Sequence, residues 1–100
     1  MKRYAVADEA RNDLFEIWNY LVEHADLSAA DRVIADLHAA MRKLAQTPLI
    51  GHRREDLTDQ PVRFWSVHAY FVIYDPDSQP LAVARVLHAS RDVESILEER

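Results

Sequence analysis

The chain has 100 residues, which allows one domain with a single modest hydrophobic core. Seventeen Asp and Glu outweigh twelve Lys and Arg, and the resulting charge of −5 argues against direct binding of nucleic acid through phosphate contacts. Cysteine is absent and Gly51 is the single glycine, which excludes disulfides, thiol catalysis and a glycine-rich phosphate loop. No apolar run is long enough for a membrane span, and there is no signal-peptide core and no metal-ligand pattern. We therefore expect a cytoplasmic protein without cofactor, metal or membrane contact.

The first half of the chain predicts a short strand followed by a hairpin of two helices. Residues 2–6 form the strand, and residues 8–25 form the first helix. Residues 29–46 form the second helix, with Ser28 as its N-cap, and Pro48 ends it. Apolar residues recur at helical spacing at Ala10, Leu14, Ile17, Leu21 and Ala25, and at Ala30, Val33, Ile34, Leu37, Met41, Leu44 and Ala45. The connection between the helices is short, so we expect them to be antiparallel.

Three further expectations concern this hairpin. Asp8 is expected to cap the first helix, because Ala7 before it has no capping side chain. Phe15 and Trp18 widen the apolar stripe and are expected in the core between the helices. Asp31 is expected in the first turn of the second helix, where a negative charge is favourable.

The second half of the chain predicts three strands and a last short helix. The strands are residues 62–68, 70–75 and 81–88, and their short links indicate an antiparallel meander. Residues 91–98 predict the helix, with Ser90 as its cap. The chain is therefore predicted to be one α+β domain, a helical hairpin packed on a small antiparallel sheet in the order β-α-α-β-β-β with a short C-terminal helix.

The middle strand of this meander has no polar face. An antiparallel sheet covered on one side alternates apolar and polar residues, but residues 70–74 read Tyr-Phe-Val-Ile-Tyr. Both faces of this strand are therefore expected to be buried. The hairpin can cover only one of them, so the C-terminal helix or a partner protein must cover the other.

Four local motifs follow one another in an order that resembles a known family. Residues 10–20 read A-x-x-D-L-x-x-I-W-x-Y, and residues 44–51 read L-A-x-x-P-x-x-G. Residues 62–74 read V-R-x-x-x-V-x-x-Y-x-V-I-Y, and residues 85–92 read R-V-L-H-x-x-R-D. Together they resemble the ParE-type toxins of bacterial type II toxin–antitoxin modules, within the wider ParE/RelE group. The resemblance covers nearly all of residues 1–100.

The resemblance implies a toxin that a cognate, ParD-like antitoxin neutralises in a hetero-oligomer. Characterised ParE members mostly act on DNA gyrase, so gyrase is the target that the resemblance implies. Two positions depart from the family pattern. Ala7 stands where Thr or Ser usually caps the first helix, and Ala89 stands where Gly is common.

Two sets of residues are candidate contacts under this resemblance. The target is expected to meet the last strand and the C-terminal helix, at Arg85, His88, Arg91, Asp92, Ile96 and Leu97. The antitoxin is expected to meet the apolar sheet face and the outer side of the hairpin, at Arg63, Trp65, Phe71 and Arg85. Arg85 lies on a mostly apolar strand face and needs a carboxylate partner, either internal, such as Asp92 or Glu94, or from the antitoxin.

Two alternatives remain open from the sequence. RelE members of the group cut messenger RNA on the ribosome, and metal-free cleavage would need a proton shuttle such as His88 with cations such as Arg63, Arg85 and Arg91. The acidic chain, with an acidic tail that has no Tyr or His after Arg91, favours a binding protein over this enzyme. The other alternative is a non-toxic interaction module that retains only the fold.

Overall fold

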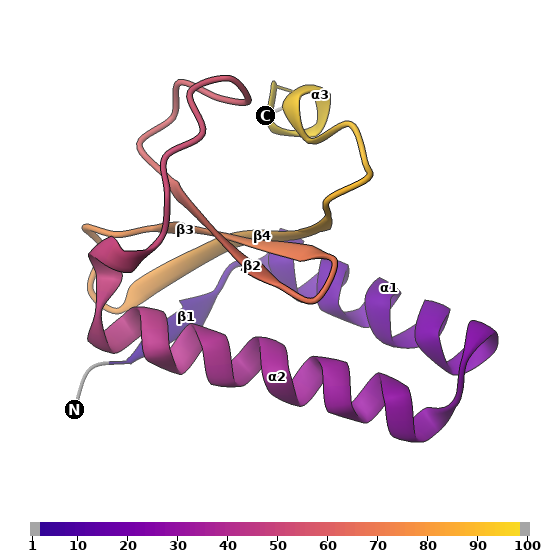
Figure 1. Ribbon diagram of the computed structural model, residues 1–100. Helices are drawn as coiled ribbons and strands as arrows, with labels where there is room; N and C mark the ends of the chain where they lie inside the picture. Colours follow the sequence, from indigo (N-terminus) through magenta and orange to yellow (C-terminus); the bar gives the residue numbers. More distant parts are fainter. Residues whose placement is uncertain (1–2, 99–100) are drawn as a thin grey trace.

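The computed structural model describes residues 3–98 and shows a helical hairpin on one face of a four-stranded sheet (Figure 1). The element order is the predicted one, with a C-terminal helix after the last strand. The elements are β1 (Tyr4–Val6), α1 (Asp8–His24), α2 (Leu27–Gln46), a 3-10 turn (Pro48–Ile50), β2 (Arg63–Val67), β3 (Tyr70–Asp75), β4 (Leu81–His88) and α3 (Val93–Glu98). Residue 2 of the predicted first strand lies outside the described residues.

The sheet has the strand order β1-β4-β3-β2. The meander of β2, β3 and β4 is antiparallel, as predicted. In contrast, β1 pairs in parallel with β4, from Tyr4 opposite Leu81 to Val6 opposite Val83, so the sheet is mixed. A parallel pair requires a crossover of a dozen or more residues, and the hairpin and meander that separate β1 from β4 provide it.

The main core lies between the hairpin and the sheet. Its fully buried residues come from both helices and from β3 and β4, at Ala10, Leu37, Met41, Leu44, Val72, Tyr74, Val83 and Val86. The predicted helical stripes therefore face the sheet. Within residues 3–98, no helix is both long and apolar enough to cross a bilayer.

The helix caps differ from the predicted ones. Asp26, not Ser28, caps α2, because the helix begins at Leu27 and the Asp26 carboxylate accepts a 2.7 Å hydrogen bond from the Ala29 amide. Asp31 consequently lies beyond the first turn. Ala7 is the N-cap of α1 and no side chain caps it, so the predicted capping role of Asp8 is wrong.

A second core covers the opposite face of the sheet. Val93 and Leu97 of α3 pack there against Phe64, Ile73 and Leu87. Val62 and Leu57, from the loop between α2 and β2, belong to the same cluster. In Figure 1, α3 and this loop lie on the side of the sheet away from the hairpin. The prediction that β3 is buried on both faces is confirmed, and α3 of the same chain is the cover.

The cap of α3 also differs from the prediction. Asp92, not Ser90, performs this role, since its carboxylate oxygens accept hydrogen bonds from the Ser95 amide at 3.3 Å and the Ser95 hydroxyl at 2.8 Å. Asp92 directly precedes Val93, the first residue of the helix, whereas Ser90 lies too far ahead of it.

The loop between α2 and β2 is fixed by the buried hydroxyl of Tyr74. This hydroxyl donates to the Pro48 carbonyl at 2.6 Å and accepts from the Gly51 amide at 2.9 Å. A Cβ atom on Gly51 would overlap the Tyr74 hydroxyl and ring edge. Glycine is therefore needed here for close approach, since its φ of −71° is open to any residue.

We expect Gly51→Ala to destabilise the fold by about 1–3 kcal/mol, the usual cost of forcing an extra methyl group into a packed site. Urea unfolding of the purified protein measures the change. Ala39→Ser adds one heavy atom at an exposed position of α2 and is the matched control, with little change expected. Equal stability of Gly51→Ala and the parent chain would show that the Tyr74 contact is loose.

Alkaline pH is expected to weaken the fold through Tyr70 and Tyr74. Burial raises the pKa of both phenols above their ordinary value of 10.0. The unfolded chain therefore loses these protons at a lower pH than the folded chain does. Their contribution to stability is complete below pH 10.0 and is lost as pH rises through the raised pKa.

Urea unfolding at about pH 8 and about pH 11 measures this loss. Tyr74→Phe removes one of the two phenols and should reduce the pH dependence, although it also lowers stability at neutral pH by removing two hydrogen bonds. A free energy of unfolding that is unchanged across this range would contradict the assignment.

Candidate functional site

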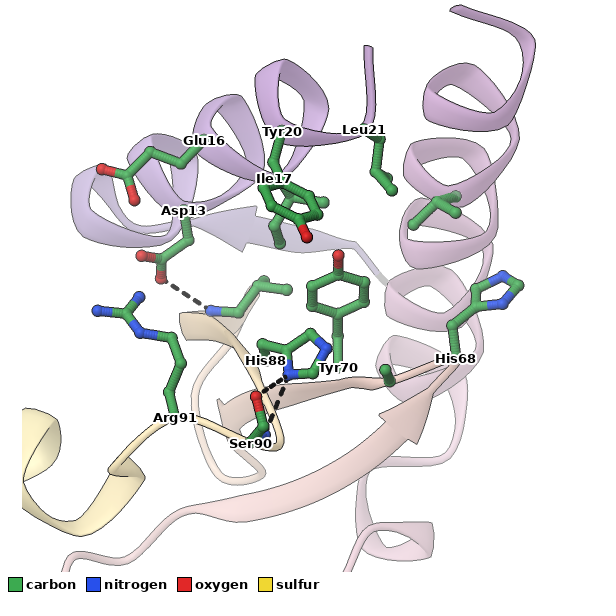
Figure 2. A pocket seen from close by; sticks show the side chains of 13 residues that line it. Asp13, Glu16, Ile17, Tyr20, Leu21, His68, Tyr70, His88, Ser90 and Arg91 are labelled. Carbon is green, nitrogen blue, oxygen red and sulfur yellow. Dashed lines mark hydrogen bonds between the residues drawn. The ribbon is translucent and has the colours of Figure 1, made fainter. Parts of the chain in front are cut away.

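A groove of about 720 Å³ opens beside α1, where the hairpin projects beyond the sheet (Figure 2). Five other segments complete its walls: α2, the turn between β2 and β3, the start of β3, the end of β4, and the segment that follows β4. Its lining residues are Asp13, Glu16, Ile17, Tyr20, Leu21, Val33, His68, Ala69, Tyr70, Val86, His88, Ser90 and Arg91. Aliphatic residues and the Tyr70 ring supply its apolar surface, and charged and polar side chains supply the rest.

Asp13 lies at one end of this groove and forms a largely buried ion pair with Arg85 of β4. Arg85 donates from Nε to Asp13 Oδ2 at 2.8 Å and from Nη2 to Asp13 Oδ1 at 2.9 Å. The two side chains are 14% and 6% exposed, and this bidentate arrangement is the strongest form of the pair. The hydrogen bond to Asp13 raises the pKa of Arg85 further above its already high value.

Asp13 also completes the edge of β4. The pairing of β1 with β4 ends at Val83, so amides farther along β4 have no neighbouring strand on that side. The amide of Val86 donates instead to Asp13 Oδ2 at 2.9 Å. One carboxylate thus replaces a missing strand and neutralises a buried guanidinium.

His88 lies at the centre of the groove. Its Nδ1 accepts a hydrogen bond from the Ser90 amide at 3.0 Å and lies 2.7 Å from the Ser90 hydroxyl. Its ring meets the Tyr70 ring edge to face, with centroids 5.2 Å apart. The segment after β4 therefore holds the imidazole against the buried Tyr70 ring.

His68 forms the opposite wall. It is the first residue of the two-residue turn between β2 and β3, and its φ of 53° lies in the left-handed region that favours glycine. Its Nε2 lies 2.8 Å from Asp36 Oδ2 on α2. The turn is thus joined to the hairpin across the groove wall.

The comparisons with known proteins agree with this fold. A family profile described as the ParE toxin of type II toxin-antitoxin system, parDE, matches residues 4–93. The chain belongs to this family. A solved structure described as a chromosomal ParDE TA system from P. aeruginosa superimposes with a TM-score of 0.72 and 18% identity, covering 88% of this chain and 96% of that chain, which shows a shared fold. No curated protein matches the chain significantly.

All the groove residues of this ParE-family chain lie within the matched residues 4–93. Of the predicted target contacts, the structure brings His88 and Arg91 to the groove. Three others have internal roles. Arg85 is paired with Asp13, Asp92 is exposed and caps α3, and Leu97 is 2% exposed in the second core. Ile96 is partly buried beside Leu97.

The predicted internal carboxylate partner of Arg85 is confirmed, but it is Asp13 and not Asp92 or Glu94. Asp92 and Glu94 lie after β4, whereas the observed carboxylate comes from α1 on the hairpin face of the sheet. Glu9, one turn before Asp13, lies 3.7 Å from the same guanidinium. An antitoxin carboxylate is not needed to neutralise this charge.

The predicted antitoxin contacts are dispersed. Arg63 donates to the carbonyls of Gly51 at 2.9 Å and Leu49 at 3.4 Å. Trp65 lies on the hairpin face of the sheet with the Lys43 ammonium 5.2 Å from its ring. Phe71 lies on the opposite face, where it packs edge to face with Phe64 and beneath the Arg54 guanidinium. The structure does not bring these residues together with Arg85 into one site.

The predicted core position of Phe15 is also wrong. Its side chain is 66% exposed on the outer side of α1, because only one side of the wide apolar stripe has a neighbouring element. Trp18 is half-buried, and its indole Nε1 donates to Asp31 Oδ1 at 3.2 Å.

Several groove residues were not identified from the sequence: Asp13, Glu16, Tyr20, His68 and Tyr70. Asp13 had a usable signal, since it lies three residues after Ala10 and four before Ile17 on the buried face of α1. A charge on a helix's apolar face calls for an opposite charge, and Arg85 on an apolar strand was the complementary candidate. The aromatic residues had no comparable signal because they are also ordinary core residues.

We expect Asp13→Asn to destabilise the chain by about 2–4 kcal/mol, because it leaves the Arg85 guanidinium buried without its charged partner. Thermal and urea unfolding measure the loss. Asp8→Asn is the matched control, because Asp8 faces Arg11 at 3.6 Å on the exposed surface and should contribute little.

A double variant, Asp13→Asn with Arg85→Gln, isolates the interaction free energy between the two side chains. We expect the double variant to be more stable than the sum of the two single effects allows, because neither charge is then left unpaired. Additive effects would show that the two side chains do not interact as the distances imply.

Proposed function

We propose that this chain is the toxin of a type II toxin–antitoxin module, that a cognate antitoxin neutralises it, and that it inhibits DNA gyrase in the cytoplasm when free. The family match over residues 4–93 is the observation that carries this proposal. Gyrase is the target that the resemblance to ParE toxins implies. The proposed action is binding, without catalysis by the chain.

The groove supports a binding function. It borders the main core and combines apolar surface from Ile17, Leu21 and Val33 with a polar rim. Interfaces commonly have this anatomy, an apolar centre surrounded by polar groups. We propose that His88 and Arg91 contact the target and that the antitoxin neutralises the toxin by covering them.

The contacts that the arginine side chains make within the fold favour a function in protein binding over RNA cleavage. A metal-free nuclease would need free cations for the scissile phosphate. Arg63 donates from Nη1 to backbone carbonyls and Arg85 is paired with Asp13, so both guanidinium groups already make contacts within the fold. The charge of −5 further disfavours a ribosomal RNA partner.

Controlled expression in bacteria tests the proposal. We expect growth arrest, its rescue by co-expression of the small reading frame beside the gene, and inhibition of gyrase supercoiling by the purified chain. Arg91→Gln should weaken this inhibition several-fold, and Arg42→Gln, an exposed arginine of α2, should not. Equal melting temperatures of the two variants would show that folding is unaffected.

Three outcomes would contradict this function. Growth without arrest would indicate a non-toxic module of the same fold. Ribosome-dependent cleavage of messenger RNA that His88→Ala abolishes would indicate an enzyme. Growth arrest with unimpaired supercoiling would support the assignment as a toxin but exclude gyrase as its target.

A further inference from the structure

The apolar faces of the two hairpin helices continue past the end of the sheet. Leu21 lies seven residues after Leu14 on α1, and Val33 lies four residues before Leu37 on α2, so both share the helix face that forms the main core. Leu14 and Leu37 are buried, whereas Leu21 and Val33 are only partly buried and line the groove. Figure 1 shows the hairpin extending beyond the turn between β2 and β3. The helices thus present apolar side chains where the sheet no longer covers them.

Aromatic side chains extend this apolar surface across the groove. Figure 2 shows Ile17 and Tyr20 of α1 on one side, and Tyr70 and His88 at the end of the sheet on the other. The Tyr70 and His88 rings pack edge to face, with centroids 5.2 Å apart. An occupant of the groove therefore meets aliphatic and ring surfaces in its centre.

The charges that line the groove balance one another. The Asp13 carboxylate is paired with Arg85 and accepts from the Val86 amide. Glu16 of α1 and Arg91 after β4 are both exposed, and they contribute one charge of each sign. Neither an acidic nor a basic occupant would therefore meet a net opposite charge. An apolar occupant with polar residues at its margin fits this lining better.

The backbone beside the groove favours a helix over an added strand. Val86 is 1% exposed, and its amide already donates to Asp13. The His88 carbonyl accepts from the Arg91 amide at 3.0 Å. A strand that joined β4 here would need accessible backbone groups at these positions. A helix makes its own backbone hydrogen bonds, so it needs only the apolar side-chain surface that the groove offers.

We propose that the groove receives the apolar face of one amphipathic helix of the antitoxin. The anchors of this helix recur at positions i, i+3 or i+4, and i+7, and they pack on Ile17, Leu21 and Val33 while its polar residues lie at the rim. A single helix can enter between α1 and the end of the sheet, whereas a flat folded surface would touch only the rim. This inference rests on the proposed function, because it assigns the occupant to the antitoxin that neutralises the chain.

Calorimetric titration of the purified chain with the product of the neighbouring reading frame tests this contact. We expect Leu21→Ala and Val33→Ala each to weaken binding about tenfold, a usual cost of truncating a residue at the centre of an interface. Phe15→Ala is the matched control for an antitoxin on the outer side of the hairpin, and Leu49→Ala is the control for loss of an exposed apolar side chain elsewhere. Neither of these two residues lines the groove, so both variants should bind like the parent chain.

A third groove variant keeps the test independent of folding. Leu21 and Val33 are partly buried, so their truncation also lowers stability, and each titration is run well below the melting temperature of the variant. Tyr20 is 57% exposed at the rim, so Tyr20→Ala should melt close to the parent chain and still weaken binding several-fold. Leu21→Met retains the size and apolar character of the side chain and should bind like the parent chain.

NMR of the isotope-labelled antitoxin in the complex identifies the secondary structure of the occupant. We expect helical Cα chemical shifts over one continuous segment, and nuclear Overhauser effects from that segment to the methyl groups of Leu21 and Val33. Chemical shifts typical of a strand in the segment that contacts these methyl groups would overturn the proposed helix.

Three further outcomes would overturn the inference. Antitoxin binding that neither Leu21→Ala nor Val33→Ala alters would place the antitoxin outside the groove and leave the proposed function standing. If these variants instead dissociated a dimer of the free chain in analytical ultracentrifugation, or weakened only the inhibition of gyrase, the groove would belong to a second copy or to the target. Absence of any antitoxin binding to the parent chain would overturn the proposed function together with this inference.

Discussion

The pairing of Asp13 with Arg85 connects the hairpin to the sheet at the point where the sheet would otherwise be incomplete. The pairing of β1 with β4 ends at Val83, three residues before Val86, so β4 would otherwise expose an unpaired amide beneath α1. Asp13 accepts from this amide and from the guanidinium with the same carboxylate. Burying two charges is costly unless they are paired and hydrogen-bonded, and here both oxygens of Asp13 accept hydrogen bonds from Arg85. The position of α1, and with it one wall of the groove, follows from this contact.

The sheet is covered on both faces, but by covers of unequal size. Two long helices bury one face, and the six residues of α3 with the loop before β2 bury the other. Val93 and Leu97 are core residues, so removing the C-terminal segment would expose Ile73 and Leu87. If such a truncation abolished activity, the loss could result from unfolding as well as from the removal of residues that contact the target. Surface residues of the groove can be changed without this complication.

The sequence predicted elements better than it predicted contacts. Apolar patterning located both helices of the hairpin and all four strands, because the order of apolar residues along one element is a local property. The caps were misplaced because Asp26 and Ser28, like Asp92 and Ser90, are both good caps two residues apart, and only the chain geometry decides between them. The groove could not be located because it joins α1, α2, a turn and the end of β4. Arg85 was known to need a partner, but that partner lies 72 residues away.

The turn at His68 has a consequence for the kinetics and entropy of association. Glycine would adopt the φ of 53° without strain, but it could not reach Asp36. The contact between His68 and Asp36 thus holds this wall of the groove in place before a partner binds, although it requires a left-handed backbone conformation at His68. A partner that docks against an ordered wall loses less conformational entropy on binding, so it can bind more tightly for the same contact area. An ordered two-residue turn can in this way lengthen the lifetime of a complex.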